Sequence, residues 1–242
     1  MKTDTQKTDL KHLDALFDVG AHFGLIRSRR HPSVKPFLFG VKNKIEIFDL
    51  EKTQEYLEKA KGFISDIVAQ GGMVLFVGGK NEARTSVATG AQKAQMPYVA
   101  GRWLGGTLTN FPEIKKRIAK LEDLTLQKEK GELGKYTKKE RLLIDREIER
   151  LQKSFSGLIP MRMTPKVLFV IDPKREHIAV AEARRLHIPV VALASSDCNI
   201  RDIEYAIPGN DASTQSINYF VEQIVSAVLN GKDRLARGDK KE

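Results

Sequence analysis

Residues 73–80 read Met-Val-Leu-Phe-Val-Gly-Gly-Lys, an unbroken apolar run that ends in two glycines and a lysine. A run that is apolar on both faces is typical of a strand buried in a parallel sheet, and the glycines predict a tight turn into a helix. Similar runs predict further strands at 97–100, 167–171, 189–193 and 204–207. Strands of this kind joined by helices predict an α/β fold with a doubly wound, mostly parallel sheet.

Apolar residues at helical spacing separate the predicted strands. They predict helices over 56–68, from 81 to about 95, from 175 to about 186, and from 211 to about 229. Upstream of them, residues 44–49 alternate between polar and apolar side chains like a half-buried strand. The helices supply the layers that a parallel sheet needs on its two faces.

Residues 111–156 interrupt this order of strands and helices. Two segments with narrow apolar seams flank a stretch that contains Gly131 and Gly134. The second segment starts with Thr137-Lys-Lys-Glu140, a capping-box pattern in which a hydroxyl and a carboxylate satisfy free backbone amides. We predict an inserted antiparallel coiled-coil hairpin. It carries 13 basic and 9 acidic residues. Because a long arm costs chain entropy and buries little, we favour a contact function over a solvated helical pair without a partner.

These patterns divide the chain into four parts. We expect residues 1–9 to form a flexible N-terminus and 231–242 a mobile charged tail, with weak phosphate contacts at most. Residues 10–110 and 157–230 are predicted to form the sheet domain, which the hairpin of 111–156 interrupts.

The composition limits the classes of protein to which the chain can belong. Of 242 residues, 41% are apolar, enough for a buried core, and Lys and Arg outnumber Asp and Glu by 41 to 31. The net charge of +10 favours a polyanionic partner such as nucleic acid, an anionic membrane or a phosphorylated ligand. A single cysteine excludes an internal disulfide, no apolar run is long enough to span a bilayer, and the N-terminus lacks a secretory signal. We therefore expect a soluble protein in a reducing compartment.

Catalytic and cofactor-binding patterns are weak in this sequence. The turn Gly78-Gly79-Lys80 departs from a P-loop, because Val74 replaces the first glycine and Asn81 the magnesium-binding hydroxyl. We interpret it as a tight strand-to-helix turn; a phosphate contact, as in an α/β enzyme or nucleotide-binding protein, is the alternative. The five histidines and one cysteine lack metal-ligand spacing, and no activated nucleophile stands out. We predict no catalytic residue, cofactor, metal site or small-molecule substrate.

The strongest functional signal is a stretch without acids between Asp18 and Glu46. Arginine offers bidentate donors to phosphates, and aromatic rings can stack on an unpaired base or anchor a loop in the core. A solvated charged face is the alternative interpretation. We predict phosphate contacts by the basic residues of this stretch and partner or structural contacts by a histidine and a phenylalanine among them. The basic residues are Arg27, Arg29, Arg30, Lys35, Lys42 and Lys44, and the two rings are His22 and Phe23.

A second candidate contact precedes the hairpin at residues 101–110, which read Gly-Arg-Trp-Leu-Gly-Gly-Thr-Leu-Thr-Asn. Arg102 is predicted to bind RNA, as are Lys115 and Lys116 on the basic face of the hairpin. Trp103, the only tryptophan, either meets RNA or a protein or plugs the base of the hairpin against the sheet domain. The sequence favours neither interpretation of Trp103.

Several short segments follow one another in an order that is highly specific in combination. They are Val19-Gly-Ala-His-Phe-Gly24, Lys35-Pro-Phe-Leu-Phe-Gly40, Leu50-Glu-Lys-Thr53, Leu75-Phe-Val-Gly78, Arg102-Trp-Leu-Gly-Gly106 with Leu108-Thr-Asn110, Leu168-Phe-Val-Ile-Asp172, Glu176-His-Ile-Ala179 with Glu182-Ala183, Ile188-Pro-Val190, and Ile207-Pro-Gly-Asn-Asp211. Together, over about residues 10–230, they resemble the ribosomal protein S2 family of the bacterial small ribosomal subunit.

The resemblance implies a flavodoxin-like (Rossmann-like) sheet domain with a coiled-coil protrusion. It implies a structural, non-catalytic role in translation near the junction of head and body of the small subunit. It also implies contacts with small-subunit rRNA and other small-subunit proteins, and help in recruiting the large mRNA-binding protein S1. We expect a cytoplasmic location without membrane contact, in a bacterial more than an organellar ribosome, because no Arg-rich, acid-poor transit peptide is evident.

The chain departs from the family pattern in two loops. The family commonly has a second histidine where this chain has Leu25. It also has an Asp-Thr-Asn sequence with a nearby proline where residues 195–199 read Ser-Ser-Asp-Cys-Asn. These differences concern the local contacts of the two loops, and neither removes a basic side chain from residues 27–44.

Overall fold

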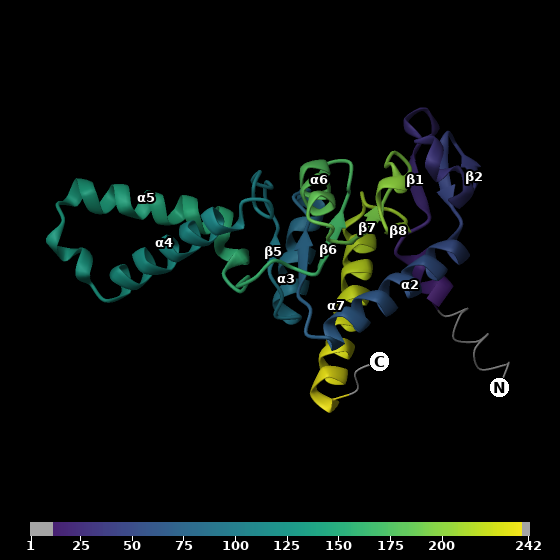
Figure 1. The fold of residues 1–242 in the computed structure, drawn as a ribbon. Coiled ribbons are helices and arrows are strands. Elements are labelled where there is room, and N and C mark those ends of the chain that lie inside the picture. The colour runs from purple at the N-terminus through teal and green to yellow at the C-terminus, as the bar shows by residue number, and fades with distance from the viewer. Residues whose placement is uncertain (1–11, 239–242) are drawn as a thin grey trace.

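The computed structural model describes residues 12–238 and is built around a five-stranded parallel sheet (Figure 1). Its strands are β4 (Val74–Val77), β5 (Tyr98–Val99), β6 (Val167–Ile171), β7 (Val190–Ala194) and β8 (Tyr205–Pro208). They lie in the order β5-β4-β6-β7-β8. β5 is added on one side of β4, and β6, β7 and β8 follow on the other side, so the order of strand addition reverses between β4 and β6. The predicted doubly wound α/β sheet is confirmed.

Helices cover both faces of this sheet. They are α2 (Leu50–Ala69), α3 (Asn81–Lys93), α6 (His177–Arg185) and α7 (Thr214–Arg237). α2, α3 and α7 pack on one face, against Phe76 and Phe169 of the central strands. α6, residues 103–108 and the base of the hairpin pack on the other face. Alternate strand residues enter two separate cores, which explains why the strands are apolar on both faces.

α2 begins earlier than its apolar spacing predicts. Asp49 caps the helix by accepting a 3.1 Å hydrogen bond from the amide of Glu51, so the first turn forms before the apolar residues start. The Thr53 hydroxyl donates a 2.8 Å bond to the carbonyl of Pro208 and thereby ties this first turn to the end of β8.

α7 continues to Arg237, although its apolar spacing predicts an end near residue 229. Gly231 is buried against α2, and Arg234 pairs with Asp66 of α2 at 2.6 Å. These contacts join the last turns to the sheet domain, so residues 231–237 continue α7, and the mobility of the tail stays a prediction. Residues 239–242 and the predicted flexible segment 1–9 lie outside the described residues.

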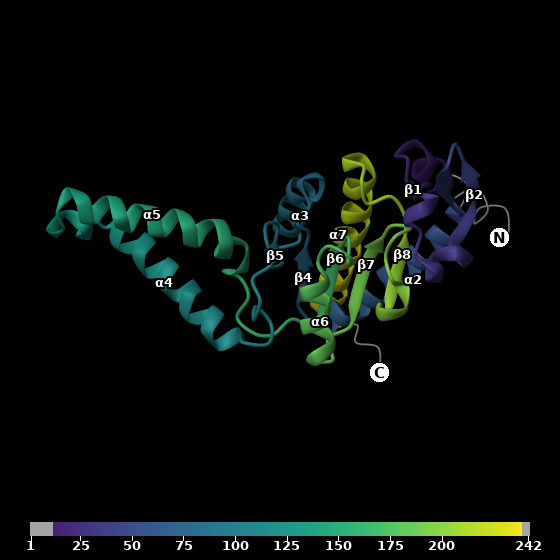
Figure 2. The ribbon, with the colours of Figure 1, turned by 90° about the horizontal axis from the view of Figure 1, so that it is seen from above.

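A second, antiparallel sheet forms at the end of the molecule opposite the hairpin (Figures 1 and 2). Its strands are β1 (Phe23–Ile26), β2 (Leu38–Lys42) and β3 (Ile45–Phe48), in the order β1-β3-β2. Residues 23–48 are here called the small sheet. The sequence predicts only β3, whose Glu46 and Phe48 are buried on the inner face.

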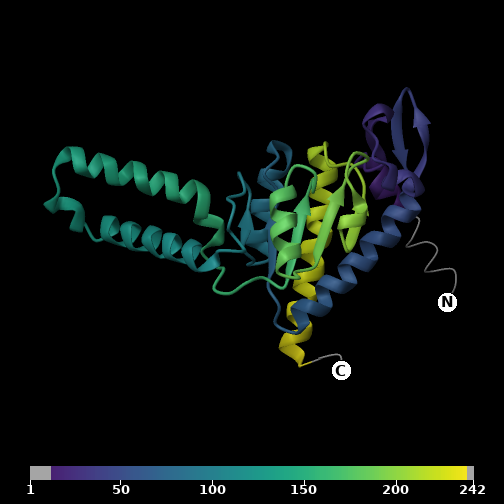
Figure 3. The ribbon, with the colours of Figure 1, turned by 45° about the horizontal axis from the view of Figure 1, so that its top comes forward.

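The predicted helical insertion corresponds to α4 (Phe111–Glu129) and α5 (Lys138–Phe155), which project from the sheet domain (Figure 3). Ion pairs of 2.7 Å join Lys120 to Glu147 and Lys128 to Asp145 between the two helices. The capping box predicted from Thr137 is present at the start of α5. The coiled-coil packing and the domain boundaries stay predictions. Among residues 12–238, no helix combines the length and apolar character of a membrane span.

Candidate nucleic-acid interface

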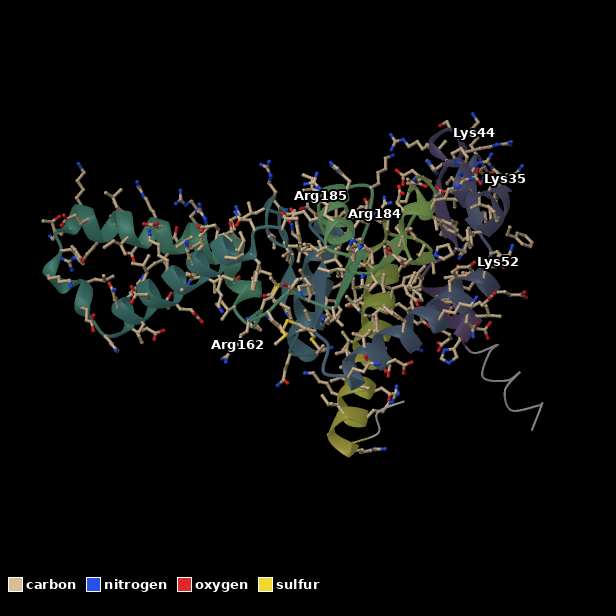
Figure 4. The ribbon with its side chains drawn as sticks, viewed as in Figure 1. Lys35, Lys44, Lys52, Arg162, Arg184 and Arg185 are labelled. Atoms are coloured by element: carbon tan, nitrogen blue, oxygen red, sulfur yellow. The ribbon has the colours of Figure 1, made fainter. Side chains whose placement is uncertain are left out.

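Five basic side chains of the small sheet are exposed and lack an ion-pair partner among the described residues. They are Arg27 and Arg29 after β1, Lys35 before β2, and Lys42 and Lys44 around the β2–β3 turn, and are here called the small-sheet cations. Figure 4 shows Lys35 and Lys44 projecting from the small sheet. The sequence-predicted cluster is thus carried by a folded element.

The β2–β3 turn places two of these cations through an unusual backbone. Asn43 and Lys44 have positive φ values of 51° and 66°, as in the two-residue turns that match the twist of antiparallel strands. The amide of Arg27 donates a 2.9 Å hydrogen bond to the carbonyl of Lys44, so the turn after β1 lies beside this hairpin turn. Positive charge from two separate segments is therefore concentrated at one end of the small sheet.

Arg30 differs from the small-sheet cations because an acid neutralises it. Its guanidinium lies 3.3 Å from the carboxylate of Glu46, which is 1% exposed. Glu46, the acid that ends the acid-free stretch of sequence, is therefore buried and paired with a basic residue of that stretch. A phosphate would have to compete with this buried carboxylate, so Arg30 is not counted among the small-sheet cations, and its phosphate contact stays a prediction.

His22 and Phe23 take part in a group of stacked rings beside the small sheet. The His22 ring lies parallel to Phe17, with centroids 4.6 Å apart, and 4.0 Å from the Phe23 ring. Burial, and then the charge of Lys42, lowers the pKa of His22, so the imidazole is neutral at pH 7. Its buried Nδ1 has no hydrogen-bond partner among the described residues. His22 therefore contributes an apolar ring surface and no charge.

Trp103 is buried at the base of the hairpin, which decides between its two interpretations. It is 5% exposed, and its indole Nε1 donates a 3.1 Å hydrogen bond to the carboxylate of Glu182 on α6. The same carboxylate accepts bonds of 2.8 to 3.1 Å from the amides of Gly106, Leu108 and Thr109 and from the Thr109 hydroxyl. Trp103 therefore joins the hairpin base to the sheet domain and is not displayed to a partner.

The remaining predicted RNA contacts lie around the start of α4. Arg102, Lys115 and Lys116 are exposed, and Lys116 pairs with Glu113 at 2.7 Å where solvent screens the interaction. The hairpin and the small sheet stand at opposite ends of the sheet domain (Figure 1). The structure therefore separates the predicted RNA-binding residues into two basic regions.

The cations at the end of α6 escape the sequence-based prediction. Arg184 and Arg185 are the last residues of the helix, where positive charge complements the helix dipole. Figure 4 shows both on α6, between the hairpin and the small sheet. Arg184 pairs with Asp202 at 2.9 Å, whereas Arg185 is exposed without an ion-pair partner among the described residues. The signal that could have identified Arg184 and Arg185 in the sequence is their position in the last turn of a predicted helix that follows a buried strand.

The turn after β4 is occupied by the protein's own carboxylates. The Lys80 ammonium lies 3.4 Å from Asp172 and 3.3 Å from Asp211. The amide of Gly79 donates a 3.2 Å bond to the carboxylate of Glu176. These are the donors that a phosphate would use, so the geometry favours the structural turn over the phosphate contact.

Cys198 completes the buried group around Lys80. Its sulfur and the carboxylates of Asp172 and Asp211 have donor atoms within 4.8 Å of one another, a spacing compatible with a metal ion. Burial, and then Asp172, raises the pKa of Asp211 to about 6, and burial also raises the pKa of the Cys198 thiol. Lys80 already balances the carboxylates, and we assign the group a structural role.

The two loops that depart from the family pattern contact each other. The amide of Leu25 donates a 2.9 Å hydrogen bond to the Ser196 hydroxyl, and the amide of His31 donates a 2.8 Å bond to the Ser196 carbonyl. Ser33 adds a 3.1 Å bond, accepted by its hydroxyl from the amide of Ile200. These bonds fasten the small sheet to the loop after β7, so both departures belong to one junction.

Comparisons with known proteins agree with this arrangement of the chain. A family model described as "Ribosomal protein S2" matches residues 16–231. A "Small ribosomal subunit protein uS2" from Nocardia farcinica is 42% identical over 229 residues, which cover 93% of this chain and 80% of the relative. Proteins of the same name from Maridesulfovibrio salexigens and Desulfatibacillum aliphaticivorans are 42% and 45% identical, over 90% of this chain and 85% and 74% of the relatives.

Proposed function

Because the chain belongs to the ribosomal protein S2 family, whose members are structural proteins of the small ribosomal subunit, we propose that it binds small-subunit rRNA through the small-sheet cations. The observation that carries the proposal is their arrangement. Five cations without an ion-pair partner in residues 12–238 lie on one folded element, and the acid nearest to them in sequence, Glu46, is buried and paired with Arg30.

The physical basis of binding is the release of counterions from the RNA backbone. Each cation that neutralises a phosphate frees condensed ions, so affinity falls as salt concentration rises. Fixed turns present these side chains, which limits the chain entropy lost on binding. Phosphate contacts alone carry no sequence information, so RNA shape and neighbouring proteins supply the main specificity.

The hairpin provides a second contact region in this proposal. Arg102, Lys115 and Lys116 face solvent at its base, and the buried Trp103–Glu182 junction holds that base on α6. A projecting pair of helices that buries little against its own domain is well placed to reach a second RNA or protein surface. Arg185 of α6, which lies between the two regions, extends the basic surface.

The finer assignments rest on the family. We propose that the chain acts near the head–body junction, contacts other small-subunit proteins and helps to recruit the mRNA-binding protein S1. The names of its bacterial relatives support a place in a bacterial cytoplasmic ribosome. A nucleotide-binding function has less support, since Lys80 and the amide of Gly79 are engaged by carboxylates.

Sedimentation tests the proposed association. The chain, added to small subunits that have been stripped of their own uS2 protein, is expected to migrate with the particles in a low-salt sucrose gradient. A gradient at high salt should leave a larger share at the top, because screening weakens phosphate contacts. A chain that stays at the top of the low-salt gradient contradicts the proposed function.

A further inference from the structure

The outer face of the small sheet carries large apolar side chains that no other part of residues 12–238 covers. Phe23 stands opposite Ile47, and Ile26 stands opposite Ile45, so these pairs share one face of β1 and β3. Glu46 and Phe48 alternate with them and are buried on the other face. The side of the small sheet that faces away from the domain is therefore the apolar one.

Two phenylalanines border a hollow on this face. Phe39 of β2 is 83% exposed and Phe17, in the helical residues 12–18, is 61% exposed. Both line a hollow of about 510 Å³, with His22 and Ile47 also in its wall. Since His22 stacks on Phe17, one wall of the hollow is a double layer of flat rings. The exposed rings of Phe39 and Phe17 could therefore stack on another flat group that enters the hollow.

Charge is unevenly distributed around this aromatic face. Lys42 stands opposite Ile45 on the same face, and Lys44 lies in the adjoining turn. The hollow itself is lined by Asp14, Asp49 and Glu51, and neither of the two lysines is among its lining residues. A polyanion would therefore keep its phosphates beside the lysines of the sheet face, because the carboxylates would repel them from the hollow.

We propose that this face binds the unpaired bases of single-stranded RNA by stacking them against Phe39 and Phe17, while Lys42 and Lys44 bind the phosphates alongside. The proposal rests on the proposed function and adds the kind of RNA segment that the small sheet takes. Aromatic rings next to cations are the arrangement by which proteins bind single strands without reading sequence. A duplex hides its base faces within the stack, so it would gain from the lysines but not from the rings.

The charge pattern favours RNA over a protein as the occupant. An apolar protein surface would also cover Phe39, Ile26 and Ile45. The cations along one edge have no ion-pair partner in the described part of the chain, so they would then need acids from the protein partner. A single RNA strand supplies both the flat apolar bases and the negative charge.

Substitutions at Phe39 test stacking without disturbing the fold, because this side chain is 83% exposed. We compare the full chain with Phe39→Leu, which keeps apolar area but no ring face, and with Phe39→Tyr, which restores the ring. The probes are a short oligoadenylate that carries one 2-aminopurine, an abasic strand of the same length, and a duplex. Circular dichroism and thermal unfolding confirm that each variant folds like the parent chain.

The parent chain is expected to bind oligoadenylate about tenfold more tightly than the abasic strand or the duplex, with quenching of the 2-aminopurine fluorescence. Phe39→Leu should lose most of this preference and leave the salt dependence and the abasic affinity unchanged, and Phe39→Tyr should recover it. Equal binding of the three probes by the parent chain overturns stacking but leaves the proposed phosphate contacts in place. Absence of binding to any probe overturns both.

A protein occupant would give a different pattern. Phe39→Leu would then bind oligoadenylate like the parent chain but fail to migrate with small subunits in the gradient. That result would overturn the stacking proposal and assign the face to a protein contact.

Discussion

Glutamine in place of all five small-sheet cations is expected to flatten the salt dependence of rRNA binding. Five phosphate contacts contribute a slope of about −3.5 to −4.5 to a plot of log K against log salt, from 0.7 to 0.9 per contact, and the variant should lose that amount. Glutamine keeps most of the length and hydrogen-bonding capacity of the side chains, so the change reports charge. Filter binding to small-subunit rRNA over a series of salt concentrations measures the slope.

Two controls separate this surface from net charge. The first replaces five exposed cations elsewhere with glutamine, namely Lys59, Lys93, Arg162, Lys166 and Arg237. The second is Arg30→Gln, which removes one charge but leaves the buried Glu46 without its partner. The first should change the slope little, and the second should lower the free energy of unfolding more than it changes the slope. If both five-residue variants change the slope equally, the charge of the whole chain and not the small sheet governs binding.

Glu182→Gln is expected to lower the free energy of unfolding by about 2–4 kcal/mol at pH 7. The carboxylate of Glu182 accepts bonds from Trp103, Gly106, Leu108 and Thr109, all of which are donors. A glutamine keeps one acceptor oxygen and turns an NH₂ group toward other donors, which leaves buried N–H groups unsatisfied. Denaturant titration followed by the fluorescence of the single tryptophan reports directly on this junction.

The pH dependence of stability gives this prediction a second readout. Burial by itself would raise the pKa of Glu182, but the hydrogen bonds from Thr109, Trp103, Gly106 and Leu108 outweigh it, and the pKa is lowered. A lowered pKa stabilises the fold above the unfolded value of about 4.3, and this contribution is lost as the pH falls through the folded pKa. The stability gap between the parent chain and Glu182→Gln should therefore narrow below about pH 4. A variant as stable as the parent chain at pH 7 would contradict the assigned role of Glu182.

The main sheet could be predicted from the sequence because each buried strand is a continuous apolar run. Val167–Ile171, for example, supplies residues to both cores, and its bounds in the sequence and the structure coincide. The small sheet was not predicted as a whole, because only β3 has an alternating pattern with a buried face. β1 and β2 have apolar residues on the exposed face, and their turn has positive φ at Asn43 and Lys44 without a glycine to signal it.

The candidate site could be predicted only in part, for electrostatic reasons. A count of charges identifies the small-sheet cations, because unpaired cations on a surface need no partner in the chain. It cannot reveal that Glu46 folds beneath Arg30, or that Lys80 meets carboxylates from the ends of other strands. The position of Trp103 was equally hidden, because its partner Glu182 lies 79 residues away in sequence. Pairing across the fold, not composition, decides which charged groups stay available.

Ultraviolet crosslinking of small subunits that contain this chain tests the central claim most directly, since it identifies the peptides that touch rRNA. The account predicts nucleotide adducts on peptides that cover residues 27–44, with further adducts near Arg102 and the start of α4. Adducts confined to the face formed by α2, α3 and α7, with none on residues 27–44, would contradict it.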